Sequence, residues 1–286
     1  MCTGGYMAEQ GEYAGPGLSC GICGSAELAP AIEKGGYRYS VCAGCGVCVL
    51  CPMPEGSFLE GLYEDFMDLE CDGVKMSEHF SDNFRGAYFR EKDLDFEDLG
   101  FEFTEKMRVL DVGCADGIFL KYLRDRHGID GEGVDVSKKM VAMGEADGLK
   151  CSTAPLSGLA GPYDVITLWD VIEHLRAPLE SLKEIKRLLA GDGALIIQTP
   201  CRGVLSEAYG SAWIQYQPPY HLHIFDFDSL THLLKRAGFR TVAWVRFGAG
   251  ITDGANAVKP VFDHVVKDMG IGDTIVLWAR KKARRK

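Results

Sequence analysis

"RVLDVGCADGIFLKYL", residues 108–123, is the stretch from which the fold class can be predicted. It joins an apolar run to a turn bounded by Gly113 and Gly117, and a pattern with helical spacing follows. A strand, a glycine turn and a helix in this order are typical of the first unit of a doubly wound α/β sheet. Asp111 stands inside the apolar run. Because a buried carboxylate without a partner is costly, we expect Asp111 to face a ligand.

The same alternation of apolar runs and helical patterns continues to the end of the chain. Apolar runs predict strands at 108–113, 131–136, 148–152, 163–169, 193–199, 241–247 and 274–280. Helical spacing predicts helices at 117–126, 138–146, 178–190 and 228–238. This order predicts parallel βαβ units in a sheet that is covered on both faces. The last run, "DTIVLWARK", is expected to pair antiparallel with its neighbour, after a long glycine-rich connection over 248–273.

Length, composition and charge exclude several classes of protein. A chain of 286 residues that is 47% hydrophobic can form one or two globular domains. Its net charge of −10 argues against a nucleic-acid partner, and we interpret the basic end "RKKARRK" as solvated. No run approaches the roughly 18 apolar residues of a membrane helix, and the start lacks a secretory signal. We therefore expect a cytoplasmic protein without a membrane partner.

The glycine turn favours a cationic ligand over a pyrophosphate. The dinucleotide fingerprint has three glycines, whereas "GCADG" at 113–117 has two, and Asp111 would repel a pyrophosphate. Asp135 ends the second predicted strand, where an acid can bind both ribose hydroxyls. Trp169 and Asp170 end the fourth. Because the carboxyl ends of parallel strands share one edge, these segments are expected to meet in one crevice.

Four segments resemble the successive motifs of the class I S-adenosylmethionine-dependent methyltransferases. They are "VLDVGCADG", "GVDVS", "YDVITLWDVIEHL" and "PPYHLHIFDFDSLTHLLKRAGF". The resemblance is to the group that carries an N-terminal zinc ribbon and includes sugar and natural-product methyltransferases, and it covers residues from about 20 to 281. It implies a Rossmann-like, seven-stranded, doubly wound sheet with a reversed last strand, together with a small N-terminal zinc ribbon.

The resemblance also implies S-adenosylmethionine as cofactor and assigns its contacts. The implied cofactor-binding residues are Asp111, Gly113, Cys114, Gly117, Asp135, Val136, Trp169 and Asp170. Asp111 and the glycine turn would hold the methionine end, and Asp135 the ribose. Ala115 replaces the usual middle glycine, and adenine recognition stays unassigned.

A cysteine-rich zone precedes this domain. Cys20, Cys23, Cys42 and Cys45 have the C-x₂-C-x₁₈-C-x₂-C spacing of a tetrahedral thiolate zinc site. Four protein ligands leave no open position, so such a zinc ion would be structural. One alternative is an iron–sulfur cluster, because Cys48 and Cys51 extend the second pair towards a ferredoxin-like run, and the other is that no metal is bound. Whether these last two thiols bind metal is left open.

The candidate catalytic residues are Glu173, His174 and His221. The resembling sugar methyltransferases use a Glu-His pair at the position of Glu173 and His174 for acid–base work, and His221 lies where that family builds its acceptor pocket. His223 is a weaker candidate, and Tyr220 and Trp213 would line the pocket. A purely structural role is the alternative for each histidine.

The expected organisation has three parts. They are a zinc ribbon over 1–54, a helical linker or lid over 55–105, and a methyltransferase domain over 106–286 with an acceptor-binding insertion at about 201–225. In the linker, Phe80, Phe84, Tyr88 and Leu94 have helical spacing and are expected to form a packing face.

The leading functional hypothesis is methyl transfer from S-adenosylmethionine to a small polar acceptor, a hydroxyl or carbon of a sugar, nucleotide sugar or natural-product intermediate. The alternatives are a zinc-ribbon interaction protein with an inactive methyltransferase-like domain, and an NAD-linked enzyme. The sequence leaves the acceptor and the oligomeric state open.

Overall fold

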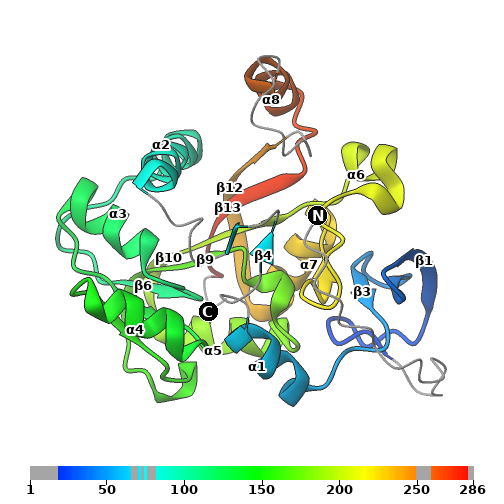
Figure 1. The fold of residues 1–286 in the computed structure, drawn as a ribbon, viewed down its shortest axis with the longest axis horizontal. Coiled ribbons are helices and arrows are strands. Elements are labelled where there is room, and N and C mark those ends of the chain that lie inside the picture. The colour runs from blue at the N-terminus through cyan, green and yellow to red at the C-terminus, as the bar shows by residue number, and fades with distance from the viewer. Residues whose placement is uncertain (1–18, 66–69, 72–73, 76–81, 249–258, 283–286) are drawn as a thin grey trace.

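The computed structural model describes residues 19–65, 70–71, 74–75, 82–248 and 259–282. Its main feature is a seven-stranded sheet in the order β12-β13-β10-β9-β6-β7-β8. The strands are β6 (Val109–Val112), β7 (Glu132–Val134), β8 (Lys150–Ser152), β9 (Tyr163–Trp169), β10 (Leu189–Pro200), β12 (Phe239–Phe247) and β13 (Thr274–Lys281). The pairs from β8 to β10 are parallel, and β13 is antiparallel to both of its neighbours. The predicted doubly wound sheet with a reversed last strand is thereby confirmed (Figure 1).

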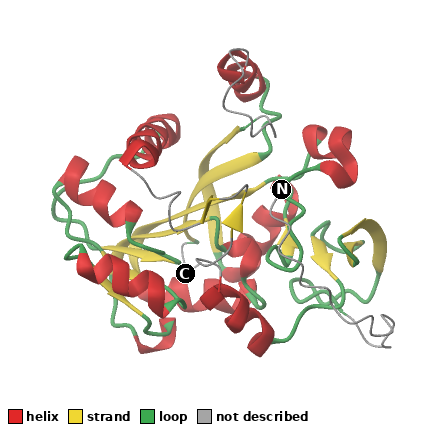
Figure 2. Ribbon diagram, in the orientation of Figure 1, coloured by secondary structure: helices red, strands yellow, loops and turns green. Residues whose placement is uncertain are grey.

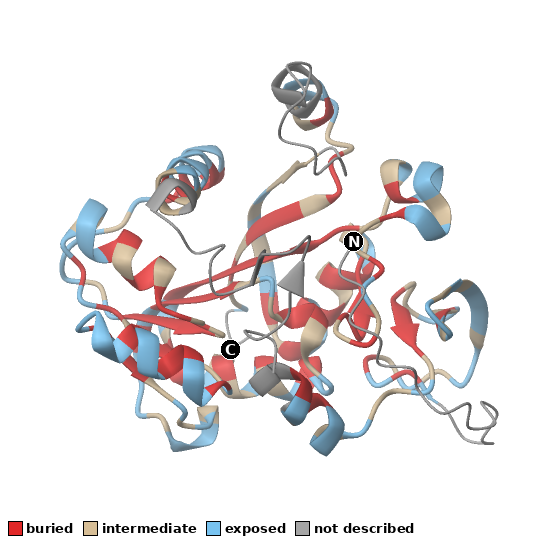
Figure 3. Cartoon of the chain, in the orientation of Figure 1, coloured by how far each residue is buried: buried red, intermediate tan, exposed pale blue. Residues whose placement is uncertain are grey.

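Helices cover both faces of this sheet, as Figure 2 shows. They are α2 (Asp82–Leu99), α3 (Ile118–His127), α4 (Lys138–Ala146), α5 (Pro178–Leu188), α7 (Phe227–Ala237) and α8 (Lys259–Asp268). Alternate residues of β10 point to opposite faces, so Leu195 and Ile197 join the apolar cluster of α5 and α7, whereas Ala194 and Ile196 join that of α2 and α3. Most residues of the central strands are accordingly buried (Figure 3).

Two local predictions differ from the structure. Helix α8 occupies part of 248–273, where we expected only a glycine-rich connection. In α2, Leu94 is 55% exposed, so it does not belong to the packing face. The buried stripe instead contains Phe89, Phe96 and Leu99, whose spacings of seven and three residues keep them on one side of a helix. Phe80 and the side chain of Phe84 lie outside the described residues.

A second sheet carries the cysteine-rich zone. It contains β1 (Leu28–Lys34), β2 (Tyr37–Cys42), β3 (Cys48–Leu50) and β11 (His223–Ile224), in that order. Its last strand comes from the predicted acceptor segment, because β11 pairs antiparallel with β3. The predicted domain boundaries stay predictions, but the ribbon and the acceptor segment share one sheet.

The remaining elements are short. They are α1 (Gly56–Asp65), β4 (Glu70–Cys71), β5 (Val74–Lys75), α6 (Val204–Tyr209) and the 3₁₀ turns η3 (Leu156–Gly158), η4 (Ile172–His174) and η5 (Gly210–Ala212). Within the described ranges, every helix is too short or too polar to span a bilayer.

Candidate active site and metal centre

Asp111 lies near the end of β6, at the edge where the parallel strands finish. Its carboxylate is buried and accepts a hydrogen bond from the Thr167 hydroxyl at 2.6 Å. Burial raises the pKa of Asp111 to about 7; the charge of Asp135 also raises it, while the Thr167 hydrogen bond and Lys92 lower it. A cationic ligand at this point would compensate the buried charge.

The turn after β6 requires its two glycines. Gly113 and Gly117 have φ of 74° and 81°, in the left-handed region that favours glycine. A Cβ added to either would come within 2.4 Å of a neighbouring side chain, Val171 for Gly113 and Leu149 for Gly117. The glycines therefore serve backbone conformation and close packing of the turn.

The N–H groups of the turn are largely used within the protein. Gly113 and Cys114 donate to the Val134 carbonyl, and Gly117 donates to the carbonyl of Cys114. The Ala115 N–H donates to Asp135 Oδ2 at 2.9 Å. A phosphate-binding turn keeps such donors for its ligand. This arrangement therefore favours a cofactor without phosphate, in line with the sequence analysis.

The acid at the end of β7 is fixed in orientation. Besides the bond from Ala115, Asp135 accepts the Ser137 N–H through Oδ1 at 2.8 Å, and its side chain is half-buried. Each carboxylate oxygen has a second lone pair, so both can still accept a ribose hydroxyl. The next side chain, Val136, is 69% exposed, while Cys114 is buried in the apolar cluster of α3.

Lys92 is a candidate site residue that the sequence analysis missed. It projects from α2, is fully buried, and places its ammonium 3.9 Å from the ring centre of Trp169. It donates to Gln198 and Asp95, each at 2.7 Å. A single lysine in a charged, amphipathic helix carries no local signal of such a role. The indole of Trp169, one of the implied cofactor-binding residues, thus already contacts a protein cation.

The residues around Trp169 also carry strain and an unsatisfied donor. Asp170 has φ of 53°, which is rare outside glycine, and accepts a hydrogen bond from Gln198 at 2.7 Å. The indole Nε1 of Trp169 is buried and has no hydrogen-bond partner in the described part of the chain. Both features are common at binding sites, which is consistent with the predicted position of the cofactor.

Glu173, His174 and His221 converge beside this edge. One ligand atom of each lies within 4.8 Å of the others. Glu173 is buried on η4 and accepts a hydrogen bond from the Thr199 hydroxyl at 2.9 Å. Burial raises the pKa of Glu173 well above its usual value and lowers the pKa of His174 to about 4 and that of His221 to about 3. Both imidazoles are therefore neutral at pH 7.

Of the other acceptor-side candidates, His223 and Trp213 make their contacts elsewhere, whereas Tyr220 contacts this group through its carbonyl. His223 is buried in β11 and stacks on Phe225 with ring centres 5.9 Å apart. Trp213 is buried and donates its Nε1–H to Asp273 at 2.8 Å, so it is a core residue. Tyr220 is partly buried, and its carbonyl binds His174 Nδ1 at 2.9 Å.

The ribbon holds the acceptor segment in place. The buried Tyr39 hydroxyl on β2 donates to the carbonyl of His221 at 2.7 Å. The Leu50 N–H donates to the Leu222 carbonyl at 2.9 Å. The position of His221 therefore depends on Tyr39 and Leu50, which lie far from it in the sequence, in the cysteine-rich zone.

Four cysteines of the ribbon form a compact cluster. The sulfurs of Cys20, Cys23, Cys42 and Cys45 lie within 4.8 Å of one another. The contacts between Cys20 and Cys45 and between Cys23 and Cys42 are 3.6 Å and 3.4 Å. Zinc–thiolate bonds of about 2.3 Å in a tetrahedron require sulfurs about 3.8 Å apart. The four thiols fit a zinc ion, and neither Cys48 nor Cys51 belongs to this cluster.

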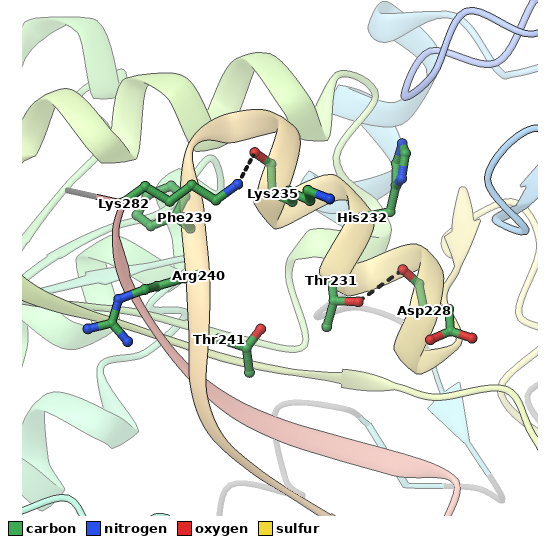
Figure 4. A pocket seen from close by; sticks show the side chains of 8 residues that line it. All are labelled: Asp228, Thr231, His232, Lys235, Phe239, Arg240, Thr241 and Lys282. Atoms are coloured by element: carbon green, nitrogen blue, oxygen red, sulfur yellow. Dashed lines mark hydrogen bonds between the residues drawn. The ribbon is translucent and has the colours of Figure 1, made fainter. Parts of the chain in front are cut away.

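A surface pocket of about 410 Å³ lies at the opposite edge of the sheet. Figure 4 shows its lining from α7, the start of β12 and Lys282, whose ammonium donates to the Lys235 carbonyl at 3.4 Å. Because β12 runs parallel to β9, its first residues lie at the amino edge, away from Asp111. This pocket is therefore separate from the candidate active site.

Comparisons with known proteins agree with this geometry. Residues 84–243 match a family described as "Methyltransferase domain". The ubiquinone biosynthesis O-methyltransferase of Caulobacter sp. (strain K31) is 31% identical over 122 residues, which cover 39% of this chain and 48% of that protein. Phosphoethanolamine N-methyltransferase 1 of Zea mays is 30% identical over 156 residues, 49% of this chain and 31% of that protein. The chain thus spans half or less of these curated relatives.

Solved structures share the fold at low identity. Geranyl diphosphate C-methyltransferase from Streptomyces coelicolor A3(2) superposes with a TM-score of 0.52 at 13% identity, covering 71% of this chain and 86% of that one. A chain from a complex of the Haloferax volcanii Trm112 methyltransferase activator with a methyltransferase has a TM-score of 0.52 at 18% identity, covering 72% and 97%.

Proposed function

The chain belongs to the methyltransferase-domain family, and from that membership we propose that it transfers a methyl group from S-adenosylmethionine to a small polar acceptor. The acceptor atom is a hydroxyl oxygen or a carbon of a sugar, nucleotide sugar or natural-product intermediate. The relatives named above are O-, N- and C-methyltransferases, so they support methyl transfer without selecting an acceptor.

One observation carries the cofactor part of this proposal. Asp111 is a buried carboxylate with a raised pKa, beside a glycine turn whose N–H groups are mostly used internally. Such a site suits a ligand that is cationic and lacks phosphate. Asp111 would bind the ammonium of the methionine moiety, Asp135 the ribose hydroxyls, and Trp169 would lie along the cofactor.

The protein's own groups would position the acceptor and remove its proton. S-adenosylmethionine supplies a methyl group already activated by a positive sulfur, so positioning and proton removal are the remaining tasks. His174 and His221 both donate Nδ1–H to backbone carbonyls, those of Tyr220 and Gln215. Each neutral ring therefore presents a lone pair on Nε2, which can accept a proton.

Zinc in the four-thiolate cluster would act through structure. With four cysteine ligands the ion has no open position, so it would stabilise the ribbon and, through β3 and β11, the acceptor segment.

The decisive experiment is untargeted. The protein is incubated with trideuteromethyl-labelled S-adenosylmethionine and a metabolite extract of its source, and labelled products are sought by mass spectrometry. We expect a labelled small molecule that is absent with Asp111→Ala. If the protein binds the cofactor but no labelled small molecule appears, the acceptor would be carrier-bound or a macromolecule. Loss of cofactor binding as well would favour the interaction-protein alternative.

A further inference from the structure

The group formed by Glu173, His174 and His221 has the composition of a metal site. Glu173 Oε1 lies 3.9 Å from His174 Nε2, and a ligand atom of His221 lies within 4.8 Å of both. The two histidine rings meet edge to face with centres 4.8 Å apart. Two imidazoles and one carboxylate are a recurrent ligand set for divalent transition metals.

Each of the three side chains is oriented by a hydrogen bond from its far side. His174 donates Nδ1–H to the Tyr220 carbonyl at 2.9 Å, and His221 donates Nδ1–H to the Gln215 carbonyl at 2.7 Å. Glu173 Oε2 accepts the Thr199 hydroxyl. Metal-binding histidines almost always donate their other ring N–H in this way, which directs the Nε2 lone pair to the ion.

One carboxylate oxygen in this group is buried without a hydrogen-bond partner among the described residues, which favours a cation at the centre of the group. Glu173 is 1% exposed, and its Oε1 has no hydrogen-bond partner among the described residues. Leaving a buried acceptor unsatisfied costs about 1–3 kcal/mol. The separation of 3.9 Å from His174 Nε2 is too long for a hydrogen bond. A cation between the ligand atoms of the three side chains would satisfy this oxygen.

We propose that Glu173, His174 and His221 bind a divalent transition-metal cation, separate from the ion of the four-thiolate cluster. Ligands at about 2.1 Å from an ion lie about 3.0–3.5 Å apart, so small side-chain rotations would close the group. Nitrogen and oxygen ligands distinguish this site from the thiolate site.

The site would deepen the proposed function, on which this step rests. Three protein ligands leave a position open for an oxygen of the acceptor. With both imidazole Nε2 lone pairs on the ion, neither ring would take the proton of the acceptor; the ion would instead lower the pKa of a hydroxyl bound there, and the proton would leave to solvent water. This selects acceptors that carry a hydroxyl.

The test is a cobalt titration of protein that is first loaded with one equivalent of zinc, so that the four thiolates are occupied and the second site stays available to cobalt. We expect one equivalent of Co²⁺ to bind with weak visible absorption and without sulfur-to-metal charge-transfer bands. Glu173→Gln is nearly isosteric and should weaken this binding about 100-fold or more, since losing even an outer-shell partner costs 10–100-fold. His221→Asn should do the same.

Controls separate this proposal from misfolding and from the proposed function. His264→Asn removes an exposed histidine that pairs with Asp268 on α8, and it should leave cobalt binding unchanged. Calorimetry with S-adenosylmethionine reports the fold of each variant. Equal cobalt affinity in Glu173→Gln and the unaltered protein, or cobalt bound by thiolates alone, would overturn the metal site. If the unaltered protein binds cobalt at this site but does not bind S-adenosylmethionine, only the proposed function would be overturned.

Discussion

The cofactor end and the acceptor end of the candidate site are built in different ways. At the cofactor end, Asp111, Asp135 and Trp169 lie at the ends of neighbouring strands within a single stretch of about sixty residues. At the acceptor end, His221 is held by Tyr39, which lies 182 residues away in the chain. Cofactor binding should therefore be independent of the ribbon, whereas turnover should require it.

Metal removal is the strongest test of this difference. Structural zinc contributes about 10–16 kcal/mol to the folding of zinc-finger peptides, so chelation of the four-thiolate ion should disorder the ribbon and β11. We expect turnover to be abolished while the Kd of S-adenosylmethionine, measured by calorimetry, changes by no more than about threefold. Added zinc should restore turnover. Parallel loss of cofactor binding would show that the two ends are not independent.

Asp111→Ala should produce the converse effect. Removing the carboxylate takes away a charge-assisted contact worth about 1.5–3 kcal/mol, so cofactor affinity should fall about 10- to 100-fold. At saturating cofactor, the KM of the acceptor should be unchanged. Asp147→Ala is the matched control, because Asp147 is exposed at the end of α4 and pairs with Lys121. An altered acceptor KM would contradict the separation of the two ends.

Cofactor binding should weaken in acid. The pKa of Asp111 is raised to about 7 in the unliganded protein, so below about pH 7 it carries a proton. A cationic ligand favours the ionised form, and protonation therefore competes with binding. Affinity should fall about 15-fold between about pH 7 and about pH 5.5. Calorimetry with Asp111→Asn should give a flatter profile; the same slope in this variant would assign the effect to another group.

Tyr39→Phe should have the smallest effect and only at the acceptor end. It removes the hydrogen bond to the His221 carbonyl, worth about 1 kcal/mol, so kcat/KM for the acceptor should fall about fivefold. The Kd of S-adenosylmethionine should not change. Tyr216→Phe is the matched control, since its ring packs on that of Tyr39 with ring centres 5.2 Å apart, whereas the hydrogen bond to the carbonyl comes from the Tyr39 hydroxyl. An equal effect of both variants would indicate a general packing role for Tyr39.

Local patterns predicted the elements well where periodicity is strong. The strand and helix predictions between 108 and 247 differ from the structure by a few residues at most. They failed at α8, which follows a glycine-rich stretch, and at Leu94, whose place on its helix depends on what the helix packs against.

The candidate site residues that could be predicted from the sequence are those at or just after the ends of predicted strands. The cofactor candidates could be identified because a strand, a turn and a helix are specified by residues close in sequence, and parallel strands bring their carboxyl ends to one edge. The cysteine pairs could be identified by spacing for the same local reason. Their metal and the catalytic roles remain proposals.

The amino-acid sequence by itself was enough to establish the sheet, its order of strands and helices, and the cysteine spacing, because these depend on local periodicity. The placement of Lys92 on Trp169, of Tyr39 on His221, and of β11 beside β3 came only from the folded chain. The physical reason is that burial and complementary shape select such contacts between distant segments, and neither leaves a repeating pattern in the sequence.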